Sequence, residues 1–156
     1  MGMKATAYCD GRGDASGTRG ARACVLKFED GTEIEKAERL KPCTNIVAEH
    51  LAIQLALEMA IDAGVRRLLV YNDSQTPVHH VDGLYEVKAD HVKPIVQRTW
   101  ELGSHFDSVQ VRWVPREMTL QADLLCRNID REKSGRTRPG GPIVVSTPPN
   151  PFLPQS

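Results

Sequence analysis

Residues 5–11 have the sequence Ala5-Thr6-Ala7-Tyr8-Cys9-Asp10-Gly11, which predicts a first strand, residues 4–10, that ends in an acid. Aspartate is unfavourable in strands, and a carboxylate beside apolar neighbours costs free energy unless something pairs with it. Two interpretations stay open at this point. Either Asp10-Gly11 is an ordinary strand-to-turn junction, or the strand places Asp10 in a functional site.

Two more strands follow the first one closely. Residues 12–20 contain three glycines and predict a loop, and residues 21–28 and 32–40 have strand-like patterns. Glu29-Asp30-Gly31 between them is a hairpin signal, because Asp-Gly suits a tight turn between two strands. The first three strands are therefore expected to form an antiparallel meander.

The next segment changes from strand to helix. Thr44 is a good N-cap, residues 45–63 are apolar around much of a helix circumference, and Gly64 is the expected stop. Residues 66–71 then form a strand that is almost continuously apolar after its basic start. A strand, a helix and a strand in this order indicate a parallel crossover in an α/β sheet.

The remaining elements are shorter. We expect a short helix over 78–81, a helix over 92–102 with Pro94 in its first turn, a fifth strand over 109–114 and a last helix over 119–129. Trp100 and Trp113 are expected in the core.

Length and composition indicate one domain with a tail. The chain has 156 residues and a net charge of zero, with no apolar run long enough to cross a membrane and no signal-peptide core. We therefore expect a monomer in the cytoplasm. Residues 131–156 hold six prolines and three glycines, and four basic residues against one acid give them a net charge of +3. This tail either binds phosphates or is a plain linker.

Four acids occupy comparable positions: Asp10 and Asp73 at strand ends, Glu49 and Asp123 near helix starts. In an open α/β sheet such positions converge on one crevice. Like charges about 4 Å apart repel by a few kcal/mol per pair, so an empty cluster would be unfavourable. Hard divalent cations such as Mg²⁺ or Mn²⁺ prefer oxygen ligands, and two of them can flank a phosphodiester. The four acids therefore predict a divalent-metal site.

Each acid also has an ordinary structural explanation. Asp10 fits a turn, Asp73 fits a helix cap, and Glu49 and Asp123 fit acids at helix N-termini, where the macrodipole favours negative charge. Their joint placement on one rim of the sheet is what favours a site.

The chain resembles type 1 ribonuclease H over roughly residues 4–130, in the form that lacks a basic handle helix. The motifs that carry the resemblance are Tyr8-Cys9-Asp10-Gly11, Thr44-Asn45-Ile46-Val47-Ala48-Glu49, Asp73-Ser74-Gln75, and Trp113-Val114-Pro115-Arg116-Glu117 followed by Ala122-Asp123. It implies a ribonuclease H-like catalytic domain over residues 1–130, with a five-stranded mixed sheet flanked by helices. Strands one to three would be antiparallel, and strands four and five parallel to strand one.

The resemblance also implies an activity. It predicts an endoribonuclease that hydrolyses the RNA strand of RNA/DNA hybrids with two Mg²⁺ (or Mn²⁺) ions and leaves 5′-phosphate and 3′-hydroxyl ends. The alternatives are a non-catalytic nucleic-acid-binding relative, or another nuclease of this fold that acts on DNA or duplex RNA. An intact set of four acids disfavours pure binding, because carboxylates repel phosphates.

Carried over by position, Asp10, Glu49, Asp73 and Asp123 would be the catalytic metal ligands. The substrate-binding residues implied by the resemblance are Gly11, Thr44, Asn45, Ser74, Gln75 and Arg116. Ile46 stands where many relatives have a second Asn, so one minor-groove contact is expected to be missing. The loop before Asp123 has no His, and Arg116 or Glu117 is the candidate to replace part of that residue's role in product release.

Overall fold

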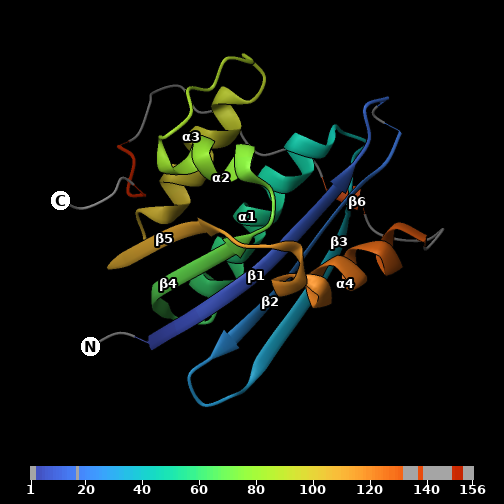
Figure 1. Ribbon diagram of the computed structural model, residues 1–156. Coiled ribbons are helices and arrows are strands. Elements are labelled where there is room, and N and C mark those ends of the chain that lie inside the picture. Colours follow the sequence, from blue (N-terminus) through green and yellow to red (C-terminus); the bar gives the residue numbers. More distant parts are fainter. Residues whose placement is uncertain (1–2, 17, 132–136, 139–148, 153–156) are drawn as a thin grey trace.

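The computed structural model describes residues 3–16, 18–131, 137–138 and 149–152. A twisted sheet runs through the middle of the molecule, with the order β5-β4-β1-β2-β3-β6 (Figure 1). The strands are Met3–Gly13 (β1), Gly20–Phe28 (β2), Glu33–Leu40 (β3), Val65–Asn72 (β4), Ser108–Trp113 (β5) and Thr137–Arg138 (β6).

The predicted five-stranded mixed sheet is confirmed. β1, β2 and β3 pair antiparallel, β4 pairs parallel with β1, and β5 pairs parallel with β4. The helices are Asn45–Asp62 (α1), Gln75–Asp82 (α2), Lys93–Gly103 (α3) and Leu120–Arg131 (α4), with a short 3₁₀ helix Arg116–Met118 (η1) before the last. η1 lies in a segment that the sequence predicted as loop.

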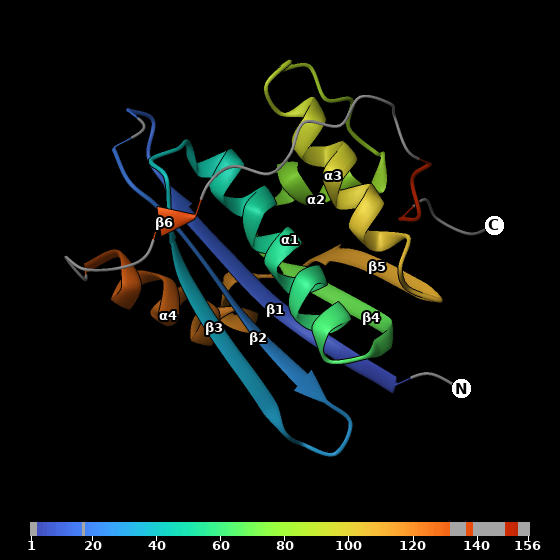
Figure 2. The ribbon, with the colours of Figure 1, turned by 180° about the vertical axis from the view of Figure 1, so that it is seen from behind.

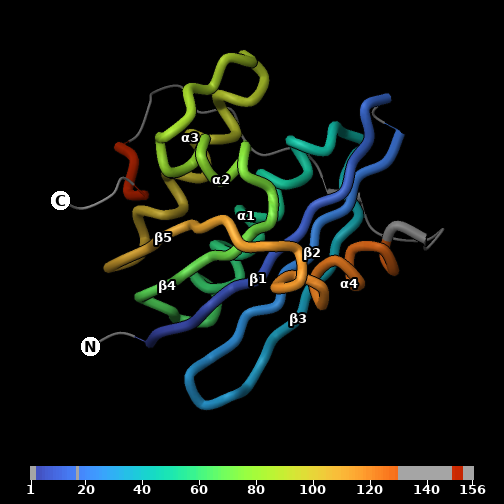
Figure 3. The backbone as a smooth tube through the Cα atoms, viewed as in Figure 1, coloured from blue at the N-terminus to red at the C-terminus, as the bar shows by residue number. Residues whose placement is uncertain are grey.

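The helices form two unequal layers. α1 covers one face of the sheet, α2 packs against β5 and α1, and α3 packs against α1 (Figure 2). α4 covers β1, β2 and β3 on the opposite face. The tube view shows how α1 crosses between β3 and β4 while α4 lies apart from it (Figure 3). The main core is therefore the space between the sheet and α1.

α1 is the central packing element. Thr44 caps it, because its hydroxyl accepts a hydrogen bond from the Val47 amide. Ile53, Leu55 and Leu57 are fully buried, as the apolar pattern predicted. The helix ends before Gly64, whose positive φ of 79° suits the turn into β4.

β1 is longer than the sequence indicated. It continues to Gly13, so Asp10 lies inside the strand and the predicted strand-to-turn junction at Asp10-Gly11 is wrong. The glycine is needed for a different reason. A Cβ on Gly11 would overlap the carbonyl of Ala48, so glycine lets β1 lie directly against the first turn of α1.

Two described pieces of the segment predicted as a tail pack on the domain. Thr137–Arg138 pairs parallel with the end of β3. Phe152 is buried in the main core cluster, where its ring lies against Gly103. Asn150 donates a hydrogen bond to the Val81 carbonyl beside it. The rest of the tail, and so its predicted role with phosphates, lies outside the described residues. None of the helices in the described ranges combines the length and apolar composition that a bilayer span needs.

Candidate active site

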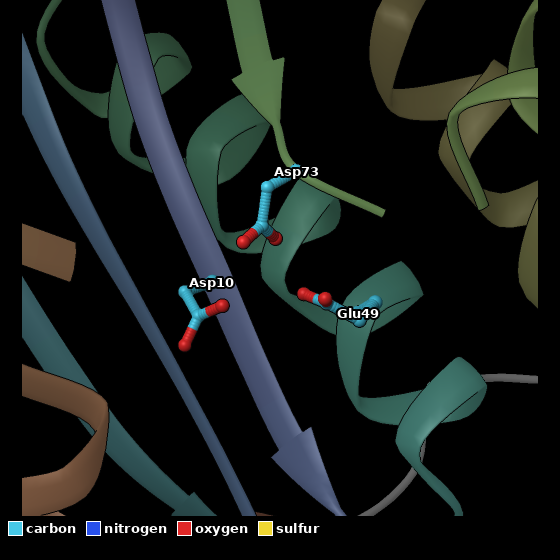
Figure 4. A group of neighbouring side chains, drawn as sticks. All are labelled: Asp10, Glu49 and Asp73. Carbon is cyan, nitrogen blue, oxygen red and sulfur yellow. The ribbon is translucent and has the colours of Figure 1, made fainter. Parts of the chain in front are cut away.

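Three carboxylates from three elements point into one space (Figure 4). Asp10 comes from β1, Glu49 from the second turn of α1, and Asp73 follows the end of β4. Each residue offers a carboxylate oxygen, and these oxygens all lie within 4.8 Å of one another. The structure therefore brings together three of the four acids that the sequence predicted.

The strand register places two of them side by side. β1 and β4 are adjacent and parallel, with Tyr8 opposite Tyr71. Asp10 and Asp73 each come two residues later, so side-chain alternation sets them next to each other at this end of the sheet. Because the ends of parallel strands and the starts of the following helices meet there, α1 supplies the third acid.

Glu49 is held by two hydrogen bonds from the site itself. Its Oε1 accepts from the amide nitrogen of Gly11 at 2.6 Å and from Nδ2 of Asn72 at 3.2 Å. The close approach of β1 to α1 at Gly11 makes the first bond possible. The second comes from a fully buried side chain at the end of β4, so Glu49 has one fixed orientation.

Several acidic side chains of the site lie close together and are buried. Burial, followed by the charges of Asp73 and Asp123, raises the pKa of Asp10 to about 7, while the charge of Arg12 acts in the opposite direction. Burial, followed by the charges of Asp10 and Asp73, also raises the pKa of Glu49 well above its ordinary value. Protonation of Asp10 and Glu49 relieves the repulsion among the neighbouring carboxylates.

The pKa of Asp73 is raised as well, mainly by burial. The Arg116 guanidinium and a hydrogen bond from Thr119 act in the opposite direction. This carboxyl is half-buried, whereas Asp10 and Glu49 are almost fully covered. A divalent cation would relieve the repulsion among the three without protonating them.

The donor set fits a hard cation. It consists of carboxylate oxygens, and within the described residues Oδ2 of Asp10 is buried without a hydrogen-bond partner. An unpartnered buried acceptor is unfavourable unless a ligand satisfies it. Oxygen-only ligands favour Mg²⁺ or Mn²⁺ over softer metals.

Asp123 lies beside Asp10 but outside the group of three. It is buried near the start of α4, and a hydrogen bond between the two carboxyls contributes to the raised pKa of Asp10. Its Oδ2 is 2.9 Å from Nη2 of Arg127 and 3.6 Å from Nη2 of Arg116. The fourth predicted acid is therefore ion-paired with two arginines.

The predicted substrate-binding residues surround the carboxylates. Thr44 and Asn45 are exposed at the N-terminus of α1, where Oδ1 of Asn45 accepts from the Gly13 amide at 3.3 Å. Gln75 is exposed at the start of α2, and Ser74 precedes it. The Ser74 amide donates to the Asn72 side chain at 2.8 Å, while its own side chain makes no capping bond.

Gly11 and Arg116 complete this set. Gly11 uses its amide for Glu49, so its predicted contact with an RNA sugar stays a prediction. Arg116 is exposed in η1 and lies close to Asp123. Its predicted role in product release also stays a prediction.

Sequence reasoning missed three residues of the site. Asn72 orients Glu49, Thr119 bonds to Asp73, and Arg127 holds Asp123. Asn72 could have been found because it is a polar residue at the end of an apolar strand. Arg127 could have been found because it lies four residues after Asp123 on the same helix face. The contact from Thr119 depends on how η1 folds and had no signal of its own.

One aromatic prediction is wrong. Trp113 is 43% exposed and is not a core residue. Its indole nitrogen donates a 3.0 Å hydrogen bond to the backbone carbonyl of Asp73, so the ring supports the site from outside. Trp100 does pack against the core, and its indole bonds to the Val81 carbonyl.

Known proteins share this fold. The structure of RNase H1 from the halophilic archaeon Halobacterium salinarum is similar, with a TM-score of 0.77 and 28% identity over 80% of this chain and 96% of that one. LC11-RNase H1 in complex with an RNA/DNA hybrid shares the fold, with a TM-score of 0.73 and 24% identity over 80% of this chain and 94% of that one.

A mycobacterial protein is similar in sequence and in structure. The bifunctional protein Rv2228c of Mycobacterium tuberculosis is 29% identical over 129 residues, which cover 81% of this chain and 35% of that protein. The chain thus spans about a third of the length of the curated relatives it matches. The N-terminal RNase H domain of Rv2228c, solved as a fusion with maltose-binding protein, has a TM-score of 0.76 with 24% identity over 81% of this chain and 92% of that one.

A family model, described as reverse transcriptase-like, matches residues 9–129. This range contains all four predicted acids, the whole of α1, α2 and α3, and most of α4. The chain therefore belongs to the reverse transcriptase-like family, and its fold is that of ribonuclease H.

Proposed function

We propose that this protein is an endoribonuclease that hydrolyses the RNA strand of RNA/DNA hybrids and leaves 5′-phosphate and 3′-hydroxyl ends. The observation that carries the proposal is the group formed by Asp10, Glu49 and Asp73, whose oxygens lie within 4.8 Å of one another. The similarity to RNase H1 structures supports a nuclease of the ribonuclease H type, and the hybrid bound to LC11-RNase H1 supports the substrate.

The metal-holding residues follow from the geometry. Asp10, Glu49 and Asp73, with Asp123 beside Asp10, would hold the two Mg²⁺ or Mn²⁺ ions. When bound, such ions supply a water activated for attack on the phosphodiester and stabilise the leaving oxygen.

The chain's own residues do the positioning. Gly11 and Asn72 keep Glu49 oriented toward the other carboxylates. The exposed N-terminus of α1, with Thr44 at its cap, is suited to a phosphate of the DNA strand because free amides and the helix dipole favour anions there. These contacts would fix the hybrid before the bond is cut.

Selection of RNA would come from groups beside the carboxylates. Asn45 and Gln75 are exposed at the starts of α1 and α2 and would contact the minor groove of the hybrid. Glu49 and the Gly11 backbone would contact the 2′-hydroxyl of the attacked nucleotide. That hydroxyl is the group that distinguishes RNA from DNA in a duplex.

A panel of matched duplexes tests the proposal. The full chain is incubated with Mg²⁺ or Mn²⁺ and one sequence prepared as RNA/DNA hybrid, duplex RNA and duplex DNA, with either strand labelled. We expect internal cuts only in the RNA strand of the hybrid, with 3′ ends that a polymerase extends. Equal cleavage of duplex RNA or DNA, or binding of the hybrid without turnover, would contradict it.

A further inference from the structure

The sheet has an uncovered area on the side that carries α4. Figure 1 faces this side, and α4 covers β1, β2 and β3 near the site, while no helix lies over the opposite ends of β1, β4 and β5. Figure 2 shows that the other side is covered by α1. The uncovered area forms a hollow of about 560 Å³ lined by β1, β2, β4 and β5. We call it the open sheet face.

Aromatic rings and cations occur together on this face. The rings of Tyr8 and Tyr71 contact each other with centroids 5.3 Å apart, and both are half-buried. Nζ of Lys27 lies 5.1 Å from the centre of the Tyr8 ring, within cation–π range. Lys4 and Arg67 are exposed beside them at the edge of the hollow.

The charges on this face are not matched. In the described part of the chain neither Lys4 nor Arg67 forms an ion pair. Glu29 is the one acid among the described residues that line the hollow, against the three cations Lys4, Lys27 and Arg67, so the lining has an excess of positive charge. A ligand that supplies negative charge would therefore complement the face.

The open sheet face is continuous with the candidate active site. Side chains alternate along a strand, so Lys4, Thr6 and Tyr8 project to the same side of β1 as Asp10. Cys9 belongs to the core on the other side, as this alternation requires. The seven residues from Asp10 back to Lys4 are six steps along the strand and span about 20 Å at the usual rise.

We propose that the open sheet face binds single-stranded RNA that continues from the strand held at Asp10. The proposal rests on the proposed function, because it is the cleaved strand that touches Asp10. Half-buried tyrosine rings on an open sheet face, flanked by lysine and arginine, suit unpaired bases and their phosphates. Paired bases are already stacked in a duplex and cannot use the tyrosine faces, so the face favours a single strand.

The test compares two hybrids that share one duplex. One is blunt, and the other carries a single-stranded RNA extension of about eight nucleotides, within the ~4–16 that single-strand-binding domains occupy. The extension is placed at the 5′ end or the 3′ end in separate substrates. The measured quantity is the ratio of kcat/KM on the extended hybrid to kcat/KM on the blunt one. We expect a ratio on the order of ten for one of the two ends.

The contributions of the Arg67 charge and of the Tyr8 ring are tested with matched variants. Arg67→Glu should bring the ratio to about one, whereas Lys36→Glu, an equal charge change on the exposed part of β3, should preserve it. Tyr8→Phe keeps the aromatic face and should preserve the ratio. Tyr8→Leu removes the face and should lower the ratio, with circular dichroism confirming that the variant is folded.

A binding measurement separates this proposal from the proposed function. Fluorescence anisotropy of a labelled single-stranded RNA is recorded for the full chain and for Arg67→Glu, without cleavage. Weaker binding by Arg67→Glu than by Lys36→Glu supports the face even if no hybrid is cut. Any of three results would overturn the proposal. They are a kcat/KM ratio of one in the original protein, equal effects of Arg67→Glu and Lys36→Glu, and tighter binding of single-stranded DNA than of single-stranded RNA.

Discussion

The amide nitrogen of Gly11 donates a 2.6 Å hydrogen bond to Oε1 of Glu49, and this bond joins β1 to α1 at the candidate site. It exists because the strand lies against the first turn of the helix without an intervening Cβ. Backbone packing and carboxylate orientation are thus set by the same residue.

We therefore expect Gly11→Ala to impair activity more than stability. The new methyl group would overlap the Ala48 carbonyl and displace α1, which costs about 1–3 kcal/mol as overpacking. Because Glu49 moves with the helix, the rate of hybrid cleavage should fall on the order of 100-fold. Stability is measured by urea unfolding and the rate under single-turnover conditions.

Gly31→Ala is the matched control. Gly31 lies in the β2–β3 hairpin with a φ of 89°, and a Cβ there would meet no atom within 4 Å. This change should cost about 1–2 kcal/mol through backbone strain while cleavage stays normal. Equal activity losses in the two variants would contradict the role of Gly11 in positioning Glu49.

The free energy of unfolding should depend on pH through Asp10. Its pKa is about 7 in the folded chain against an ordinary value of 3.8, so the folded state binds more protons between these values. In EDTA, this contribution to stability is fully present below about pH 4 and is lost as the pH rises through 7.

Asp10→Asn should remove this dependence. The variant is expected to be more stable than the original chain at pH 8 by an amount on the order of a few kcal/mol, and about equal to it at pH 4. Chemical unfolding at a series of pH values measures the difference. A variant that is less stable at pH 8 would show that the Asp10 carboxylate is stabilised in the metal-free protein.

Asn72→Ala should change the protonation of Glu49. The Asn72 hydrogen bond lowers the pKa of Glu49, so its loss should raise that pKa further. The acidic limb of the pH–rate profile should then move to higher pH, with a loss of stability of about 1–3 kcal/mol from the unpaired buried group. A drop in rate without any shift of the profile would indicate a purely structural role.

Arg127→Ala should strengthen divalent-cation binding. The guanidinium lies 2.9 Å from Asp123 and competes with a cation for its carboxylate. We expect Mn²⁺ affinity, measured by calorimetry, to rise severalfold. Arg98→Ala breaks an i,i+3 ion pair with Glu101 on α3 and should leave the affinity unchanged. Weaker Mn²⁺ binding by Arg127→Ala would mean that the arginine is needed to hold Asp123 in place.

Phe152→Ala should destabilise the domain although the residue lies in the segment predicted as a tail. Phe152 is 5% exposed and packs against Gly103, so its truncation is expected to cost about 3 kcal/mol, the lower end for a buried phenylalanine. Urea unfolding measures this cost. A change below about 0.5 kcal/mol would show that this contact is not maintained in solution.

Local pattern was enough to predict part of the sheet. The Asp30-Gly31 hairpin signal predicted the antiparallel pairing, and the apolar helix from Asn45 before the next strand predicted a parallel crossover. The complete five-stranded arrangement was implied by the resemblance to ribonuclease H. Asp10, Glu49 and Asp73 could be grouped because strand ends and helix starts meet at one rim.

What sequence could not show depends on contacts between distant segments. Gly11 looked like a turn former because the overlap with Ala48 arises only when β1 meets α1. Trp113 looked like a core residue because its bond to the Asp73 backbone follows from the β4–β5 pairing. Phe152 was hidden in a proline-rich segment whose composition gives no reason to expect packing.

Cleavage of a hybrid by Asp10→Asn tests the central claim most directly. A hybrid with 5′-labelled RNA is incubated with Mg²⁺ and the original chain, Asp10→Asn, or Asp62→Asn, which makes the same change at the exposed end of α1. The account predicts that the original chain and Asp62→Asn cut the RNA and that Asp10→Asn is at least about 1,000-fold slower. Equal cleavage by Asp10→Asn, or activity that persists in EDTA, would contradict it.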